Sequence, residues 1–353
     1  MTQVSEPTQQ LNKGVNRLKL AAIIVSLLGI SLFGYFIYAV GFHQIYVGVT
    51  RFGFAGFGVI LALYFVRILV RAYAWKLSVH EPYFLTMRDA IGAVVIGEAM
   101  SSTIPLGILI SGTAKAVVVR KRLPLVAGLS SVTTENLFYS LITSIFLILG
   151  AAVFLRNFTI DESVVVMLDG LIVLVGGLVV LGFIMVLRQW HFVSESCEWL
   201  YQRGHFTRYL ENLRLDARLF ENLIYDFYRS YPRRFLPICG FESAYHLLGI
   251  AEVWIILGRL TGIYDGLMTP FLLESVSRLV TIFFKLIPFV IGVDEAGARY
   301  VGSTVMLATG VAITLAIIRK GRMLFWTAIG ALLILKRGLS IREIRTIRRD
   351  DAV

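Results

Sequence analysis

The sequence predicts an all-α protein that crosses a membrane several times. Hydrophobic residues make up 57% of the 353 residues and charged residues only 16%, with a mean hydropathy of +0.76. A water-soluble globule of this size has no core able to bury so much apolar surface. The apolar residues also gather in runs near the length that a helix needs to cross a bilayer, about 20 residues.

We expect about 7–9 hydrophobic segments in two halves that resemble each other. The predicted segments are residues 20–42, 53–75, 90–110, 123–155, 164–187, 235–260, 268–292, 301–318 and the shorter 323–335. They divide the chain into an N-terminal tail (1–19), a first membrane half (20–187), a polar connector (188–234), a second membrane half (235–335) and a basic C-terminal tail (336–353).

The polar N-terminal tail ends in Lys13, Arg17 and Lys19, ahead of a long apolar run without a small-residue cleavage site. This pattern predicts an uncleaved signal anchor with a cytoplasmic N-terminus. Cys197 and Cys239 are the only cysteines of the sequence, so neither a disulfide framework nor a cysteine metal site is expected. No cofactor is predicted.

The net charge of +11 is spread over short clusters next to apolar segments. Such clusters follow the positive-inside bias and attract anionic lipid headgroups, so membrane lipids rather than nucleic acid are the expected partners. The clusters comprise Lys115 with Arg120, Lys121 and Arg122, then Arg319 with Lys320 and Arg322, and the tail from Lys336 onward.

Simple alternation of crossings would place the cluster at residues 115–122 outside the cell. The conflict disappears if segments 90–110 and 268–292 each enter the membrane and return as re-entrant hairpins. Both are interrupted by proline and glycine: Pro105 with Gly107 is echoed by Pro288 with Gly292. Gly/Pro-broken segments at corresponding places in two halves are the best sequence indication of a transporter's binding site.

The connector contains apolar residues at three-, four- and seven-residue spacing: Leu210, Leu213, Phe220, Leu223 and Phe227. This pattern predicts one or two amphipathic helices on the cytoplasmic membrane surface. A solvated connector is the alternative.

The segment from residue 274 to 295 sets charges into a membrane-grade apolar background. Helical periodicity places five polar side chains on one stripe: Glu274, Ser277, Arg278, Thr281 and Lys285. Charges at bilayer depth are costly, so this stripe is expected to face protein or water. Glu274 and Arg278 can neutralise each other, whereas Lys285 needs a negative ligand group, Asp294 or Glu295.

Arg67 and Arg71 lie four residues apart near the end of the second segment. They either bind a phosphodiester through their planar forks or extend toward the membrane surface, an alternative that suits Arg71 better than the deeper Arg67. Glu98 and Glu135 also lie in apolar segments and need partners, which are these arginines or, for Glu98, Lys115, in pairs that would act as structural struts.

Glu242 and His246 share a helical face beside Tyr245 in the sixth segment. A Glu/His pair in a membrane either relays protons or holds two helices together by hydrogen bonds.

Residues 111–141, SGTAKAVVVRKRLPLVAGLSSVTTENLFYSL, contain a small turn, a basic cluster and a helix with an acidic residue, Glu135. Asn136 follows where arginine is usual. A second signature comprises Glu274, Ser275, Arg278, Pro288, Gly292, Glu295, Arg319 and Arg322. These features resemble the lysylphosphatidylglycerol synthase transmembrane, or flippase-like, family, and most closely its hopanoid-associated branch.

The resemblance implies a bacterial inner-membrane protein that binds or translocates lipids. It extends to the flippase half alone, because no aminoacyltransferase domain follows residue 335, so synthase activity is not implied. The sequence also contains no nucleotide-binding loop, so movement would be downhill or coupled to an ion gradient.

We therefore expect a lipid translocase or lipid-binding transporter, not an enzyme, with a charged cavity at the membrane midplane. The alternatives are a membrane-embedded lipid-modifying transferase and a scaffold for lipid-biosynthesis enzymes. The residues expected to contact the substrate are Arg67, Glu98, Lys115, Glu135, Glu274, Arg278, Lys285, Pro288, Gly292, Asp294 and Glu295.

Overall fold

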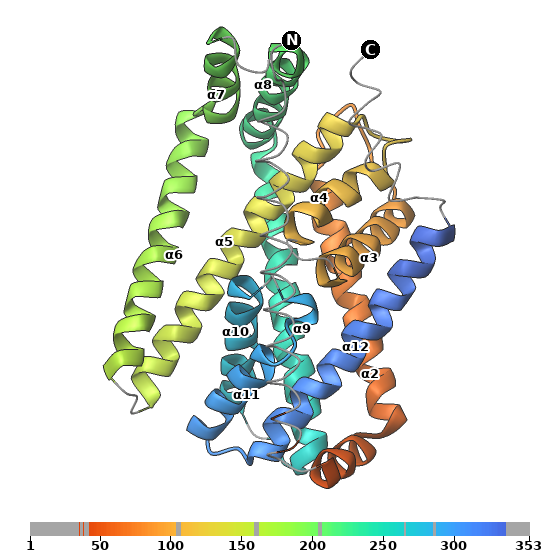
Figure 1. Ribbon diagram of the computed structural model, residues 1–353, viewed down its shortest axis with the longest axis vertical. Helices are drawn as coiled ribbons and strands as arrows, with labels where there is room; N and C mark the ends of the chain where they lie inside the picture. Colours follow the sequence, from red (N-terminus) through yellow and green to blue (C-terminus); the bar gives the residue numbers. More distant parts are fainter. Residues whose placement is uncertain are drawn as a thin grey trace, which may run out of the picture.

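The computed structural model describes Tyr35, Tyr38 and residues 42–336, apart from 104–106, 159–161, 204–206, 265 and 285–286 (Figure 1). All its regular structure within these ranges is helical. The predicted segment 20–42 lies almost entirely outside them.

The described part of the first half contains five helices. They are α2 (Phe42–Leu77), α3 (Met87–Thr103), α4 (Gly107–Val118), α5 (Leu125–Asn157) and α6 (Glu162–Arg188). α2 bends at Gly53, where a φ of +68° falls in the left-handed region that glycine adopts without strain. The straight part of α2 thus begins where the predicted second segment begins.

A helical connector and the second half follow. The connector holds α7 (Phe192–Gln202), α8 (Thr207–Ser230) and a 3₁₀ turn, η1 (Pro232–Arg234). The second half holds α9 (Phe235–Thr261), α10 (Met268–Phe283), the 3₁₀ turn η2 (Pro288–Val290), α11 (Val293–Thr304) and α12 (Thr309–Lys336).

The helices have the length and surface of a multi-pass membrane protein. Among the described residues, three stretches are long and apolar enough to cross a bilayer: Ile45–Leu77, Leu125–Asn157 and Pro232–Thr261. α6, the outer helix at the left of Figure 1, exposes a row of large apolar side chains that includes Val173, Leu174 and Leu178. Lipid is the environment in which such a surface is stable, because it needs no polar cover.

The same packing scheme occurs in both halves. α2 packs along α9 at the centre, and the short pair α3 and α4 lies in the upper part of Figure 1, whereas the pair α10 and α11 lies in the lower part. The second helix of each short pair packs on the long helix that follows it: α4 on α5, and α11 on α12. The first helix of each pair packs on the corresponding long helix of the other half: α3 on α12, and α10 on α5. The turn η2 also contacts α3, so the two short pairs meet within the protein.

Helices α5, α6 and α9 lie within about two residues of the predicted segments. The prediction for the C-terminal region is wrong: segments 301–318 and 323–335 are replaced by the short α11 and by one continuous helix, α12. The hydropathy drops in the middle of α12 because of Arg319, Lys320 and Arg322. This drop led to the prediction that a membrane span ends there. α10, for its part, ends at Phe283, so segment 268–292 is not one helix.

The connector forms a helical pair in which α8 packs on both α7 and α5. Phe227 of α8 is buried and packs edge-on against Phe138 of α5, so the apolar face of α8 is partly covered by protein. Arg214 of α8 hydrogen-bonds Glu198 of α7 and thereby lowers the pKa of this exposed carboxyl group. Amphipathic helices were predicted here; the side chains of Leu210 and Leu213 lie outside the described residues.

Candidate functional site

Two buried carboxylates and four arginines form the centre of the protein, here called the arginine cluster. Glu252 of α9 binds Arg67 and Arg322, each at 3.1 Å, and its second oxygen lies 3.8 Å from Arg319. Glu274 of α10 binds Arg319 at 2.5 Å, Arg278 at 2.7 Å and Arg67 at 3.4 Å. Four helices therefore meet through ion pairs that are shielded from solvent.

Local sequence places these groups. Glu274 and Arg278 are four residues apart on one face of α10 and form the i,i+4 pair that the stripe predicted. Gly249 of α9 gives the cluster room, because a Cβ there would collide with the Glu274 carboxylate and lie 3.2 Å from Arg67 Nη2. Glu274, Ser277 and Arg278 of the stripe thus face protein, as expected.

Aromatic rings complete the arginine cluster. The guanidinium groups of Arg67 and Arg278 lie 4.2 Å and 5.1 Å from the ring centroid of Tyr245, and Arg322 lies 4.0 Å from that of Tyr64. These are cation–π distances. The Tyr64 hydroxyl in turn donates to Glu98 at 2.9 Å.

A second group of charges, here called the Glu135 cluster, joins α2, α4 and α5. The buried Glu135 carboxylate binds Arg71 at 2.9 Å and Lys115 at 3.5 Å. Arg71 also donates to Asn136 at 3.3 Å and lies over the ring of Tyr139. The interpretation of Arg71 as a side chain reaching for the membrane surface is therefore wrong: it points into the protein toward an anion.

Lys320 of α12 holds the broken segment between α10 and α11. Its ammonium group donates to the backbone carbonyls of Phe289 and Val290 at 3.0 and 3.2 Å, and lies 3.3 Å from Glu295 and 3.9 Å from Asp294. Irregular backbone at bilayer depth needs such internal partners.

The broken segment ends in a helix cap. Gly292 has a φ of +85°, and its N–H donates to Glu295 Oε2 at 2.7 Å as α11 begins. This bond satisfies one of the free donors at the helix start. Pro288 begins η2, with its ring outside the described residues, as is the whole of Lys285.

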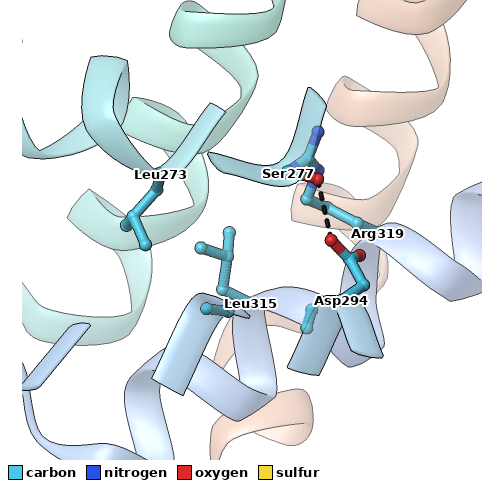
Figure 2. Close-up of a pocket in the computed structure, with 7 residues that line it drawn as sticks. Leu273, Ser277, Asp294, Leu315 and Arg319 are labelled. Atoms are coloured by element: carbon cyan, nitrogen blue, oxygen red, sulfur yellow. Dashed lines mark hydrogen bonds between the residues drawn. The ribbon is translucent and has the colours of Figure 1, made fainter. Parts of the chain in front are cut away.

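A small pocket lies between α10, α11 and α12, next to the arginine cluster. Figure 2 shows Arg319 and Asp294 on its wall, with Ser277 donating to Asp294 at 2.8 Å and Leu273 and Leu315 opposite. The pocket therefore offers a cation, an anion and an apolar side within one space.

Glu242 and His246 lie one turn apart on α9, and both are buried. His246 bonds Thr143 of α5 at 3.0 Å and stacks on Phe146. The helix-packing interpretation thus holds for His246. Within the described part of the chain, neither carboxyl oxygen of Glu242 has a hydrogen-bond partner.

Several predicted site residues come together, although the partners differ from those expected. Lys115 pairs with Glu135, while Glu98 accepts from Tyr64 instead of pairing with an arginine or Lys115. The predicted surface cluster Arg319, Lys320 and Arg322 is buried in the middle of α12, which corrects the topological interpretation. Lys115 is buried as well. The positive charges of these four residues are neutralised by carboxylates on other helices.

Glu252 was missed by the sequence analysis. It is fully buried and binds two arginines, yet it was not singled out within segment 235–260. The signal was present, because a carboxylate within a span is costly unless it has a partner.

A family model described as the lysylphosphatidylglycerol synthase TM region matches residues 19–330, which include every residue of both clusters. The chain belongs to this family. Searches of curated proteins and of solved structures found no match. Membership in the lysylphosphatidylglycerol synthase TM family places the two clusters in a multi-pass membrane domain related to membrane lipids.

Proposed function

We propose that the protein moves membrane lipids with a phosphate-containing headgroup from one leaflet to the other. The pocket beside the arginine cluster carries this proposal. Four arginines against two carboxylates leave a surplus of two positive charges, and Lys320 against Asp294 and Glu295 leaves a surplus of one negative charge. A headgroup with a phosphate and a polar or cationic end matches adjacent surpluses of opposite sign.

Arg278 and Arg319 are the best phosphate ligands of the cluster. Arg67 is fully buried with two carboxylates around it, whereas the Arg278 side chain is 14% exposed. Within the described residues, the only hydrogen bond of Arg278 Nη1 is to the Tyr245 hydroxyl, at 3.5 Å. Arg319 lines the pocket, and its Nε has no hydrogen-bond acceptor within the described residues. Arg67 acts as a strut, and Lys285 stays a predicted ligand.

Asp294 is the group best placed for the other end of the headgroup. It lines the same pocket, lies 3.9 Å from Lys320 and is 17% exposed. Glu295 is occupied by the Gly292 cap and Lys320, so it holds the broken segment in shape.

Movement would use the repeated packing of the two halves. In the proposed mechanism the pairs α3–α4 and α10–α11 are re-entrant hairpins of an inverted repeat, each closed by one ion pair. Lys115 on α4 meets Glu135 on α5, and Glu295 on α11 meets Lys320 on α12, so corresponding helices carry the same contact with its charges exchanged. Opening one pair while the other stays closed would give alternating access around the arginine cluster.

The setting of this activity is also a proposal. The protein would lie in a bacterial inner membrane with α7, α8 and the N-terminus on the cytoplasmic side. Enzymes of lipid biosynthesis, including those of hopanoid-associated lipids, would supply or consume its substrate.

The test is fluorescent-lipid movement in liposomes that contain the purified protein. Anionic, zwitterionic and cationic-headgroup lipids are compared, with Arg278→Ala as the site variant and Arg229→Ala, on the exposed end of α8, as the matched control. We expect selective movement that the site variant loses and the control keeps. A folded wild-type protein that moves no lipid would contradict the proposal and favour the scaffold or transferase alternatives.

A further inference from the structure

A second pocket lies between α5, α6 and α10, in the lower left part of Figure 1. It holds about 330 Å³ of space that protein atoms do not fill. We call it the apolar groove, because Ser275 carries the only polar side chain among its described lining residues. Its walls include Ala151 of α5, Leu171 of α6, and Leu272, Val276 and Leu279 of α10.

The apolar groove reaches from the lipid-facing surface into the protein. Leu171, Val276 and Leu279 are partly exposed, whereas Ala151 and Leu272 are buried. Apolar space left unfilled between helices is destabilising, since its lining loses contacts. Water is a poor occupant here because it needs several polar partners. In a bilayer, the apolar molecules that surround such a groove are lipid acyl chains.

Helix α10 separates the apolar groove from the pocket of Figure 2, here called the headgroup pocket. Leu272 and Val276 line the groove. The residues that follow them, Leu273 and Ser277, line the headgroup pocket. Successive helical residues point about 100° apart, so the two spaces lie at the same height on neighbouring faces of α10. A lipid that occupied both would place its phosphate beside Arg319 and a chain beside α6.

Helix α11 covers the strip of α10 between the two spaces. A Cβ added at Gly297 of α11 would lie 3.1 Å from Val280 and 3.3 Å from Val276, so the two helices touch closely there. The headgroup pocket and the apolar groove are therefore separate in this structure. A displacement of α11 relative to α10 would join them.

We propose that the apolar groove binds one acyl chain of the lipid whose phosphate the headgroup pocket holds. This inference rests on the proposed lipid transport, and it adds that the substrate is recognised by a chain as well as by its headgroup. From Leu272 to Leu279 the groove follows about 10 Å of helix. It thus accommodates part of one chain, while the rest of the lipid tail stays in the bilayer.

Photolabelling from within the chain tests the site. The probe is phosphatidylglycerol with a diazirine in the middle of one acyl chain, at low mole fraction in phosphatidylcholine liposomes that contain the protein. Adducts are mapped by peptide mass spectrometry. We expect saturable labelling of groove residues on α5 and α10. Excess dioleoylphosphatidylglycerol should reduce it several-fold, and dioleoylglycerol, which has the same chains without the phosphate, should not.

Two results would overturn the proposal directly. Absence of saturable adducts in the apolar groove would exclude the chain site. Equal competition by the two unlabelled lipids would show that the chain in the groove does not belong to a lipid held by its phosphate.

Variants that fill the apolar groove give the matched comparison. Ala151→Phe places a ring in the groove from α5, and Leu171→Trp does so from the partly exposed side, which disturbs the buried packing less. Both should lose the saturable labelling several-fold. The control is Val173→Phe on the outer face of α6, where the side chain is 74% exposed, and it should label as wild type does. Unchanged labelling in a folded groove variant would overturn the assignment.

Lipid movement by the same variants separates this inference from the proposed function. The groove variants should move fluorescent phosphatidylglycerol several-fold more slowly than wild type and Val173→Phe. Saturable groove labelling of a folded wild type that moves no lipid would contradict transport and leave the chain site in place. Movement at the wild-type rate by variants that have lost the labelling would contradict a role of the chain site in transport.

Discussion

Single buried charges decide how this membrane protein holds together. A carboxylate at bilayer depth is tolerated only when cations and hydrogen-bond donors surround it, and removing one partner leaves the other charge uncompensated. Charged residues within apolar segments therefore identified most members of both clusters from sequence alone. Their pairing was not readable, because partners such as Arg67 and Glu274 are brought together by helices far apart in the chain.

Glu252→Gln should strongly destabilise the protein. The substitution keeps the shape of the side chain but leaves Arg67 and Arg322 facing a neutral amide, which for a buried pair costs about 3–5 kcal/mol. The measurement is the thermal unfolding midpoint in detergent. Glu198→Gln, in the exposed pair with Arg214, is the control and should leave the midpoint unchanged, since exposed ion pairs contribute little. Equal midpoints for the two variants would contradict the structural role of Glu252.

Gly249→Ala should also destabilise the protein, through crowding rather than charge. The added methyl group meets the Glu274 carboxylate and Arg67, and overpacking of this kind costs about 1–3 kcal/mol. Gly177→Ala on α6 is the matched control, because nothing lies near its added Cβ. An unfolding midpoint that is lower for the α6 variant than for the α9 variant would refute the close packing at Gly249.

Helical elements were predicted well wherever hydropathy alone defines them. α5, α6 and α9 are uninterrupted apolar runs, so their ends follow from composition. α12 was divided in two because three buried cations interrupt its hydropathy, although the backbone continues through them. The pairs α3–α4 and α10–α11 are separated by breaks in the helix. Proline and glycine indicate that a break occurs, but they do not specify at which residue each helix ends.

The cap of α11 gives a prediction at the element scale. Gly292→Ala forces a side chain into the left-handed region beside the Gly292–Glu295 hydrogen bond, at a cost of about 1–2 kcal/mol. We expect a lower unfolding midpoint and slower lipid movement. The control Gly240→Ala, on an exposed face of α9, should be neutral or slightly stabilising. Normal lipid movement by Gly292→Ala would show that the capped geometry is dispensable.

At the scale of the whole molecule, the proposed transport depends on the opening of the two short helix pairs. Each pair acts as a gate, and the α4–α5 contact that closes one gate can be locked by a disulfide. A Cβ at Gly128 of α5 would lie 3.3 Å from Ala116 Cβ on α4, beside the Lys115–Glu135 pair, which is close to the spacing in disulfides. In a background with Cys197 and Cys239 replaced by serine, Ala116→Cys with Gly128→Cys should form a crosslink under oxidation.

Oxidation should stop lipid movement at this gate, and a reducing agent should restore it. The two single-cysteine variants serve as controls and should transport equally in both conditions. Transport that continues through a fully crosslinked protein would exclude opening between α4 and α5 from the mechanism.

The sequence by itself determined that the protein is an all-helical membrane protein, that charges within apolar segments such as Glu135 and Glu274 are buried, and where proline and glycine interrupt the helices. These follow from the cost of placing polar groups in lipid, a property of each segment alone. Tertiary structure decided which charges meet, that α12 runs unbroken past Arg319, and that Glu242 has no hydrogen-bond donor in the part of the chain that the structure describes. Ion pairs and buried cavities arise between helices, so they depend on packing geometry that no single segment encodes.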